Sequence, residues 1–363
     1  MTLPAQKTAA RAEAQRLLAH FRAQGAEEVE ARILQPAAEL LDLYGEDIRA
    51  RAFVTQDPLQ GEMMLRPDFT VPVVRMHMEA GLDPARYAYA GEVFRAQDSE
   101  EEDRPSEYLQ AGFEIFGGAD PAEAEAEVFA ALSGALSDLH LRAAMGDIGL
   151  LLAAVEGLGT SEPRKAALRR HVWRPRRFRA LLDRYAGRAP IPAGRAELLA
   201  LADPLDGAGP EIGLRSRTEV EARLRMLRED AATPHLPSEA VGLIDAILSV
   251  RGPAPGALDS LRALRAPGLD AALDRLGRRL DALERRGLDV SGIAFEGSFG
   301  RTTLEYYDGF VFGLFAEGRP ELPPVATGGR YDALTRVLGR GREVPAVGGV
   351  IRPEMVVRLR GAR

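Results

Sequence analysis

The chain has 363 residues, of which 46% are hydrophobic and 6% aromatic, and its formal net charge is −7 at pH 7. A chain of this length can bury a sizeable core and divide into more than one structural module. The negative charge argues against a protein built mainly to hold nucleic acid, since that function needs a basic surface.

Cysteine and histidine usage limits the possible chemistry. The chain has no cysteine, which excludes disulfides, thiolate metal sites and a cysteine nucleophile. Its five histidines are scattered without an HxxxH or HxH pair, at His20, His77, His140, His171 and His235. We therefore expect no metal site and no cofactor.

The N-terminal sequence indicates the compartment. No window approaches the run of about 18 apolar residues that a membrane span needs. The opening stretch, MTLPAQKTAARAEAQRLL, has no apolar segment ahead of a small-residue cleavage site. We therefore expect a cytoplasmic protein.

The first third of the chain predicts helices and strands in alternation. An alanine-rich helix covers the first 24 residues and ends at Gly25, and an apolar-periodic helix follows Pro36 over 37–48. Alternating residues and turn signals over 51–65 then predict a hairpin.

A helix is expected next over residues 70–80. Two neighbouring strands follow, YAYAGEVFR (87–95) and EYLQAGFEIFG (107–117), joined by the acidic run Asp98 to Asp103. Asp120 as N-cap and Pro121 at the first helical position mark the start of a strong helix.

Residues 146–290 have a different sequence pattern. Helical patterns such as EPRKAALRRHVW and LDAALDRLGRRLDALERRG are separated by Gly and Pro clusters, which predicts an all-helical insertion. Strand character returns after Ser291, and VPAVGGVIRPEMVVRL predicts a last strand and helix. We expect one sheet built from both ends of the chain.

One stretch of this insertion, 164–184, is strongly basic and contains Trp173 and Phe178. A solvated arginine-rich face or a subunit contact explains it better than a nucleic-acid site, because the whole chain is negatively charged.

Three short stretches outside the insertion suit a binding site. LRPDFT (65–70) combines an arginine, a proline-fixed bend, a carboxylate and a hydroxyl, which suits an amine or a cation. LEYYDGFVF (304–312) places two tyrosines in an expected strand, where only one can face a ligand. TGGRYDAL (327–334) puts two glycines ahead of Arg330, and glycines permit close approach to the backbone.

In this order and spacing, these stretches resemble the catalytic core of histidyl-tRNA synthetase, a class II aminoacyl-tRNA synthetase. ILQPAAELLDLYG resembles the first motif, which forms the dimer interface; AGEVFRAQ with EYLQAGFEIFG resembles the second, and VPAVGGVIRPEM the third. The resemblance implies an α+β fold, an antiparallel sheet flanked by helices. It covers residues 1–145 and 291–363, which we expect to form one domain, interrupted by the insertion.

The resemblance also implies a histidine-binding pocket. Asp68 and Thr70 match positions that hold the amino group of histidine, and Arg95 matches the arginine that contacts the carboxylate and the ATP α-phosphate. The other matching positions, on the second-motif strand and around the imidazole, are Gln110, Glu114, Tyr306, Tyr307, Gly329, Arg330 and Tyr331.

The adenylation residues of the synthetase do not match. Thr302 stands where the family has an arginine that stabilises the α-phosphate, and Met355 stands where it has the arginine beneath ATP. Arg301 lies one residue away, but in a strand a shift of one residue faces the other side of the sheet.

Three further positions depart from the family. Arg352 replaces a glycine, Gln97 replaces a glutamate, and the loop that meets ATP and tRNA is acidic instead of basic. An arginine on a transferring phosphoryl group is worth roughly 10³ to 10⁵ in rate. We therefore expect negligible ligase activity and no catalytic residue.

The chain also stops ten residues after Pro353, so we expect no C-terminal anticodon-binding domain and no tRNA partner. This combination resembles the synthetase paralogues that serve as regulatory subunits of ATP phosphoribosyltransferase. The resemblance implies a non-catalytic dimer in a hetero-oligomer. Such a subunit activates a short catalytic subunit in histidine biosynthesis and confers allosteric inhibition by histidine.

Other interpretations remain open. The chain could be a truncated synthetase-like enzyme that activates an amino acid, or a stand-alone histidine sensor. Locally, the acidic run could be a solvated loop, the tyrosine pair could be packing, TGGRYD could be a plain turn before a helix, and Asp68 could simply pair with Arg66.

Overall fold

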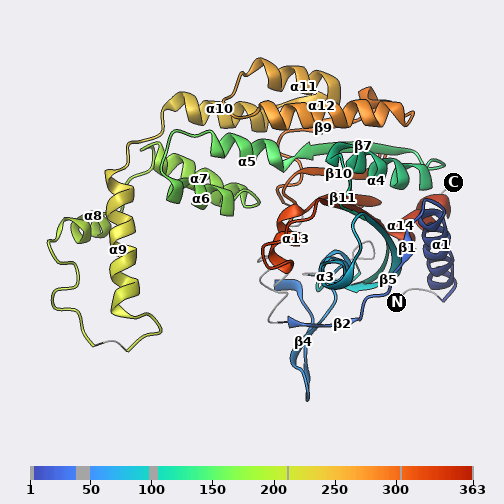
Figure 1. Cartoon of the computed structure of the whole chain (residues 1–363), viewed down its shortest axis with the longest axis horizontal. Coiled ribbons are helices and arrows are strands. Elements are labelled where there is room, and N and C mark those ends of the chain that lie inside the picture. Colours follow the sequence, from blue (N-terminus) through green and yellow to red (C-terminus); the bar gives the residue numbers. More distant parts are fainter. Residues whose placement is uncertain (1–3, 38–49, 98–104, 211, 303–304, 362–363) are drawn as a thin grey trace.

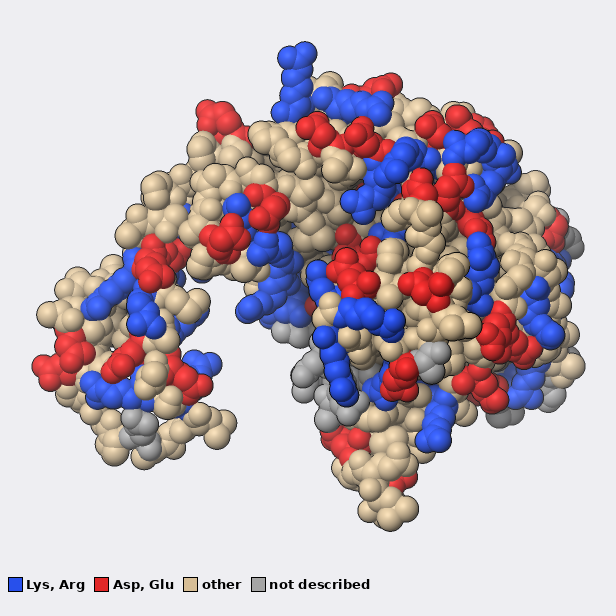
Figure 2. Space-filling view, viewed as in Figure 1, with Lys and Arg blue, Asp and Glu red and all other residues tan. Residues whose placement is uncertain are grey.

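A computed structural model describes residues 4–37, 50–97, 105–210, 212–302 and 305–361 of the chain. Figure 1 shows a body built around a large sheet, with helices of the central part of the chain layered along one side of it. These helices lead to an outlying pair, α8 (Ala193–Ala200) and α9 (Arg217–Ala232). Between this pair and the body the surface is deeply hollowed, and acidic and basic side chains are interspersed over the face in view (Figure 2).

The large sheet joins both ends of the chain. Its strands within the described residues follow the order β1-β5-β6-β12-β11-β10-β7-β9-β8. Their bounds are β1 Glu27–Glu28, β5 Ala85–Phe94, β6 Glu107–Phe116, β7 Leu141–Asp147, β8 Arg251–Pro253, β9 Ala294–Glu296, β10 Phe310–Ala316, β11 Ala326–Arg330 and β12 Ala346–Ile351. The pairing of β6 with β12, and of β7 with β10, confirms that the two ends share one sheet.

The sheet is mixed, although an antiparallel sheet was expected. Its central pairs are antiparallel, but β1 pairs with β5, and β7 with β9, in parallel. A second, three-stranded sheet consists of β2 (Leu34–Pro36), β4 (Gly61–Leu65) and β3 (Val54–Asp57). The antiparallel pairing of β3 with β4 confirms the predicted hairpin.

The two faces of the large sheet carry different side chains. Successive residues of a strand point to opposite faces, so Gln110 and Glu114 of β6 share one face while Phe113 lies on the other. Helices α1 (Pro4–Ala23) and α4 (Pro121–Ala135) contact the strands, and Phe129 of α4 packs edge-on against Phe312 of β10. We call this the helix face of the sheet.

The opposite face lies beneath two shorter helices. These are α3 (Thr70–Ala80) and α13 (Asp332–Leu338), which contact each other. Phe69, directly before α3, stacks on Tyr89 of β5 with ring centroids 4.3 Å apart. We call this the ligand face, because the residues that the sequence assigned to ligand binding gather there.

The predicted insertion is mainly helical. Its helices, besides α8 and α9, are α5 Ile148–Glu156, α6 Glu162–Arg170, α7 Pro175–Tyr185, α10 Ser238–Ser249, α11 Ala254–Ala263 and α12 Asp270–Arg285. The expectation of an all-helical insertion is wrong at β8, whose three residues form an edge strand of the sheet. Strand β7 also runs past residue 146 to Asp147, so the insertion begins inside the sheet.

Local signals explain where these elements begin and end. The Asp120 side chain accepts a hydrogen bond from Ala122 N at 2.9 Å and Pro121 opens α4, as predicted. Gly25 has φ +83° beyond the end of α1, and α14 (Pro353–Gly361) follows β12 as the predicted last helix. Most of the helix expected over 37–48 and the acidic run 98–103 lie outside the described residues.

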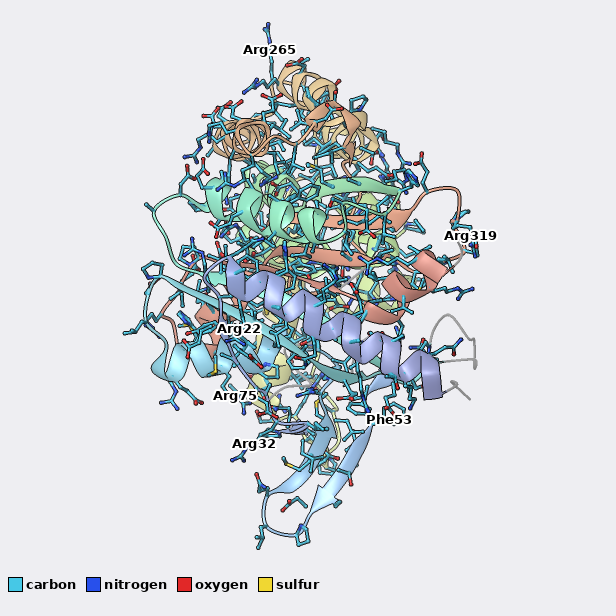
Figure 3. All side chains as sticks on the ribbon, turned by 90° about the vertical axis from the view of Figure 1, so that its right-hand side faces the viewer. Arg22, Arg32, Phe53, Arg75, Arg265 and Arg319 are labelled. Carbon is cyan, nitrogen blue, oxygen red and sulfur yellow. The ribbon has the colours of Figure 1, made fainter. Side chains whose placement is uncertain are left out.

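None of the helices in the described part of the chain combines the length and the apolar character that crossing a membrane requires. In Figure 3, turned by 90°, the small sheet projects below α1, and Arg32 and Phe53 lie near its base.

Candidate ligand-binding site

Two carboxylates that the sequence assigned to ligand binding lie on the ligand face, almost completely buried. Asp68 is 2% exposed and Glu114 is 0% exposed. Hydroxyl-bearing side chains surround them. We call this group the tyrosine–carboxylate cluster, and its members are Asp68, Thr70, Tyr89, Glu114, Tyr306, Tyr307 and Tyr331.

Glu114 accepts three hydrogen bonds from hydroxyl groups. Tyr89 Oη donates to Oε1 at 2.7 Å and Thr70 Oγ1 to the same oxygen at 3.2 Å. Tyr331 Oη donates to Oε2 at 2.5 Å. A side chain at Gly348, directly across on β12, would overlap with Oε2, so the glycine is needed to make room for the carboxylate.

These partners are all uncharged, and the pKa of Glu114 reflects this. Burial raises its pKa to about 7, although the hydrogen bonds from Tyr331, Tyr89 and Thr70 favour the charged form, and nearby Asp68 adds to the rise. Burial also raises the pKa of Tyr307. The carboxylate of Glu114 is thus held close to its protonation midpoint near neutral pH.

Asp68 lies just ahead of α3 and has a charged neighbour. It accepts hydrogen bonds from Tyr306 Oη at 3.3 Å and from Val71 N at 3.4 Å. Arg95 Nη2 lies 3.9 Å from Asp68 Oδ2, and Arg95 Nε donates to the Pro67 carbonyl at 2.7 Å. Arg95 therefore lies at the edge of the cluster.

Arg66, the alternative partner of Asp68, is engaged with the backbone instead. Its guanidinium donates to the carbonyls of Ala31 and Glu92 and lies over the ring of Phe69, 4.1 Å from its centroid.

The two adjacent tyrosines do not lie in a strand, contrary to expectation. Strand β10 begins at Phe310, and residues 305–309 form a turn-containing segment before it. Because strand alternation does not apply there, Tyr306 and Tyr307 are both buried, with rings 5.0 Å apart, and Tyr306 reaches Asp68. We call residues 305–308 the tyrosine turn.

Gln110 and Gly329 also lie on the ligand face. Gln110 is 2% exposed, and its Oε1 has no hydrogen-bond partner among the described residues. Its Cα lies four residue steps along the strand from that of Glu114, a distance of about 13 Å. Gly329 of β11 packs beneath the ring of Tyr307, where a side chain would collide with the ring.

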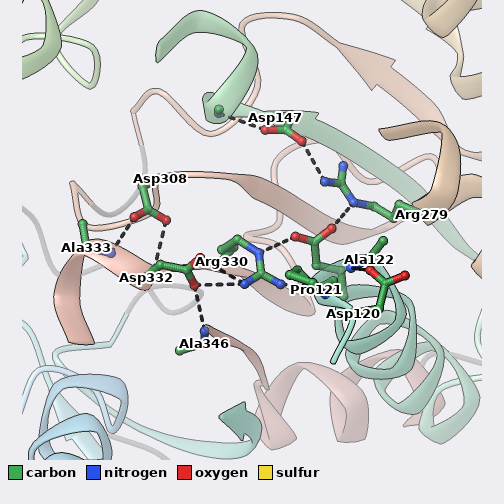
Figure 4. Close-up of polar contacts among 12 residues, drawn as sticks. Asp120, Pro121, Ala122, Asp147, Arg279, Asp308, Arg330, Asp332, Ala333 and Ala346 are labelled. Carbon is green, nitrogen blue, oxygen red and sulfur yellow. Dashed lines mark hydrogen bonds and ion pairs between the residues drawn. The ribbon is translucent and has the colours of Figure 1, made fainter. Parts of the chain in front are cut away.

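Arg330, expected beside the imidazole, is on the helix face. Its guanidinium donates to Glu125 of α4, to Asp332 Oδ1 at 2.9 Å and to the Pro121 carbonyl at 2.9 Å (Figure 4). Adjacent strand residues point in opposite directions, so Gly329 and Arg330 cannot both face the ligand. Arg330 is therefore apart from the tyrosine–carboxylate cluster.

The ion pairs around Arg330 continue into the insertion. Arg279 of α12 donates to Glu125 Oε2 at 2.5 Å and to Asp147 Oδ2 at 2.7 Å, and Asp147 caps α5 through Gly149 N (Figure 4). We call Glu125, Asp147, Arg279, Arg330 and Asp332 the arginine network. It links the first and last helices of the insertion to the sheet.

Tyr89 was missed by the sequence reasoning. It is 0% exposed, and its ring lies over Gly112 of β6, its partner across the strands. The alternation in YAYAG was a signal for one buried face, but the register that places Tyr89 beside Glu114 follows only from the pairing of β5 with β6.

The positions that differ from the synthetase lie as follows. Thr302 is exposed, and Met355 is buried in the hydrophobic core on α14. Arg301 is buried; its Nε donates to the Val172 carbonyl at 2.8 Å and its guanidinium lies over the ring of Phe178. Burial lowers the pKa of Arg301 to about 10. Residues 297–302 form turns and no strand, so the expected strand alternation does not apply to Arg301.

Two other substituted positions make local contacts. Gln97 Oε1 accepts a hydrogen bond from Arg51 Nη2 at 2.8 Å. The guanidinium of Arg352 lies over the ring of Tyr108, 5.3 Å from its centroid.

Comparison with known proteins defines the class of this fold. The sequence model of the family described as histidyl-tRNA synthetase matches residues 2–356. A histidyl-tRNA synthetase from Nostoc superposes with a TM-score of 0.63 at 17% identity, over 100% of this chain and 74% of that chain. The protein therefore has the class II fold of histidyl-tRNA synthetases, a mixed sheet flanked by helices.

Relatives closer in sequence define the family. ATP phosphoribosyltransferase regulatory subunits from Brucella canis and Brucella melitensis are 34% identical over 371 residues, with 96% of each chain covered. A structure described as an ATP phosphoribosyltransferase regulatory subunit/histidyl-tRNA synthetase from Bacillus halodurans has a TM-score of 0.69 at 22% identity, covering 99% of this chain and 81% of that chain. The chain belongs to the family of ATP phosphoribosyltransferase regulatory subunits.

Proposed function

We propose that this chain is a non-catalytic regulatory subunit of ATP phosphoribosyltransferase in histidine biosynthesis. It would activate a separate short catalytic subunit and make that subunit sensitive to histidine. The relatives that carry this name, at 34% identity over 96% of the chain, support the assignment. The observation that carries the histidine response is the pair of buried carboxylates, Asp68 and Glu114, within a cluster of tyrosines.

The chemistry of the tyrosine–carboxylate cluster suits histidine. Histidine offers a cationic amine and ring N–H donors, and a buried carboxylate that lacks a cationic partner gains most from such a ligand. Glu114 accepts only from hydroxyl groups in its described contacts, while Gln110 on the same face presents an unpartnered oxygen. We assign the imidazole to the Glu114 end and the amino group to Asp68 and Thr70.

The placement of the substituted residues supports a loss of ATP chemistry. Arg301, the arginine nearest to the expected α-phosphate ligand, is engaged with Val172 and Phe178 of the insertion. Met355 contributes to the core. A truncated amino-acid-activating enzyme would need a preorganised cation at one of these positions, since such a group supplies roughly 10³ to 10⁵ in rate.

We further propose a homodimer within a larger hetero-oligomer, in the cytoplasm, without tRNA as a partner. The surface of the small sheet supports the dimer, because several large apolar side chains are exposed together there. They are Ile33, Leu34, Phe53, Val54 and Leu59. The division into a synthetase-like core, 1–145 and 291–363, and an insertion, 146–290, remains a prediction.

The test is ATP phosphoribosyltransferase activity of the short catalytic subunit with and without this chain, titrated with histidine. Histidine-dependent pyrophosphate exchange is measured on this chain alone. We expect activity only in the mixture, inhibition by histidine, and no exchange.

Other results would favour other functions. Exchange by this chain alone, with an inactive mixture, would identify a truncated synthetase-like enzyme. Histidine binding without capture of the catalytic subunit in a pull-down would identify a stand-alone sensor.

A further inference from the structure

The turn between α6 and α7 contacts the polypeptide that leads to the ligand. This turn belongs to the insertion, and we call its residues 172–174 the insertion turn. Each of its three residues bonds to a described residue of the segment 301–307. The Val172 carbonyl accepts from Arg301 Nε at 2.8 Å, and Trp173 Nε1 donates to the Tyr307 carbonyl at 2.8 Å. Arg174 forms a two-pronged ion pair with Glu305, at 3.1 and 2.9 Å.

The contacted segment carries ligand-facing side chains. Tyr306 reaches Asp68 through its hydroxyl, and Tyr307 packs over Gly329. The two rings are carried by adjacent residues, so a ligand that contacts either ring acts directly beside the peptide that Trp173 binds. The backbone carbonyl of Tyr307 is the acceptor for the Trp173 indole. The peptide of Tyr307 is therefore one hydrogen-bonded link between the ligand face and the insertion.

The other end of the tyrosine turn is fixed to the sheet. Asp308 accepts from Asp332 N at 3.1 Å and from Ala333 N at 2.6 Å, and Asp308 N donates to the Arg330 carbonyl at 3.0 Å. Displacement of the tyrosine turn is thus restrained on the side of α13. The insertion turn, half-buried at Trp173 and Arg174, contacts the tyrosine turn through Tyr307 and Glu305.

We infer that Trp173 is a positioning residue that couples the histidine site to the helical insertion. This inference rests on the proposed function and adds the route by which the histidine signal leaves the ligand face. Occupation of the tyrosine–carboxylate cluster changes the indole contact to Tyr307 and, with it, the position of α6 and α7. Coupling between two sites of this kind typically changes an affinity about 5- to 150-fold.

Trp173 is the only tryptophan of the chain, so its fluorescence reports on this contact without labelling. The isolated full-length chain is titrated with histidine while indole emission is followed, and binding is measured in parallel by calorimetry. We expect a saturable change in emission with the same midpoint as the calorimetric binding curve.

The Trp173→Phe variant keeps an aromatic ring but removes the indole donor. In complex with the catalytic subunit, we expect it to activate the enzyme and to bind histidine within about threefold of wild type. Half-maximal inhibition should require at least about fivefold more histidine. Arg174→Gln, which leaves the indole in place, serves as a second variant if Trp173→Phe does not fold, and we expect the same separation of binding from inhibition.

The matched control is Arg217→Gln, which breaks an exposed pair with Glu221 elsewhere in the insertion. The complex that contains this variant should be inhibited by histidine as the wild-type complex is. The coupling would be overturned if the wild-type chain bound histidine in calorimetry with unchanged indole emission and both test variants were inhibited as wild type is. This result would leave the proposed function intact. Absence of calorimetric binding and of inhibition in the wild-type complex would overturn the proposed histidine response itself, and the coupling with it.

Discussion

Two glutamates of this protein are equally buried, on opposite faces of one sheet, and differ in their partners. Glu114 and Glu125 are both 0% exposed. Glu114 on the ligand face accepts from two tyrosines and a threonine, whereas Glu125 on the helix face accepts from Arg279 and Arg330. Burial alone therefore does not decide the charge of a carboxylate, and the neighbouring groups do.

The pKa values of these glutamates move in opposite directions. Burial raises both, but the positive charges of Arg279 and Arg330 overcome it and lower the pKa of Glu125 below its usual value. At Glu114 hydroxyl donors offset burial only in part, and the pKa rises to about 7. Glu125 holds the insertion to the sheet as a permanent ion pair, whereas the described partners of Glu114 are all uncharged hydroxyl groups.

Breaking the arginine network should have the largest effect on stability. Arg279→Met leaves Glu125 and Asp147 without a shared cation in a buried site, which typically costs about 3–5 kcal/mol. Urea denaturation measures the change. Arg278 is on the same helix as Arg279 and forms an exposed pair with Asp120. Arg278→Met removes this pair and should cost less than about 1 kcal/mol. Equal effects of the two variants would contradict the role of the buried pair.

Replacing each glutamate by glutamine should change the pH dependence of stability differently on the two faces of the sheet. A folded-state pKa of about 7, against 4.5 unfolded, means that the folded chain binds more protons between these values, so the Glu114 contribution to stability falls as pH rises. Above pH 7 the loss is about 3 kcal/mol. In the ligand-free chain, the stability of Glu114→Gln relative to wild type should therefore be higher at pH 8 than at pH 5. The variant should also abolish histidine binding.

Glu125→Gln should behave in the opposite way. Its lowered pKa means that the carboxylate stabilises the fold above pH 4.5 and loses this contribution only as pH falls below that value. The variant should be destabilised at both pH 5 and pH 8. Denaturation curves of the two variants at these pH values make the comparison, and a similar pH dependence in both would show that the partners do not matter.

Removing one hydroxyl from the ligand face should have a smaller, pH-dependent effect. Tyr331→Phe deletes the 2.5 Å hydrogen bond to Glu114, and bonds to charged groups contribute about 1.5–3 kcal/mol. Because the bond favours the charged form, the pKa of Glu114 should rise further and the loss should grow above pH 7. A loss that is equal at pH 5 and pH 8 would show that Tyr331 acts only by packing.

The smallest change is expected from Thr70→Val. Its 3.2 Å hydrogen bond shares Glu114 Oε1 with the shorter bond from Tyr89, so its removal should cost about 1 kcal/mol. The measurement is again a denaturation curve at pH 8. A cost larger than that of Tyr331→Phe would reverse the order of the donors inferred from their distances.

Much of the fold could be predicted because its signals are local. Asp120 with Pro121 predicted the start of α4, and the turn residues near Gly61 predicted the hairpin. The site was predicted only in part, because the face on which a residue lies depends on strand register and on where a strand begins. TGGRYD does not reveal that Arg330 faces the helices, and LEYYDGFVF does not reveal that β10 starts after the tyrosines.

The glycine opposite Glu114 has a consequence for comparing sequences. Gly348 is the residue whose side chain, if present, would occupy the space of the Glu114 carboxylate. A related chain that has any larger residue at this position cannot hold a glutamate in this geometry, whatever its overall identity. Inspecting positions 114 and 348 together therefore gives a two-letter diagnostic for sorting family members into those that can hold this buried carboxylate and those that cannot.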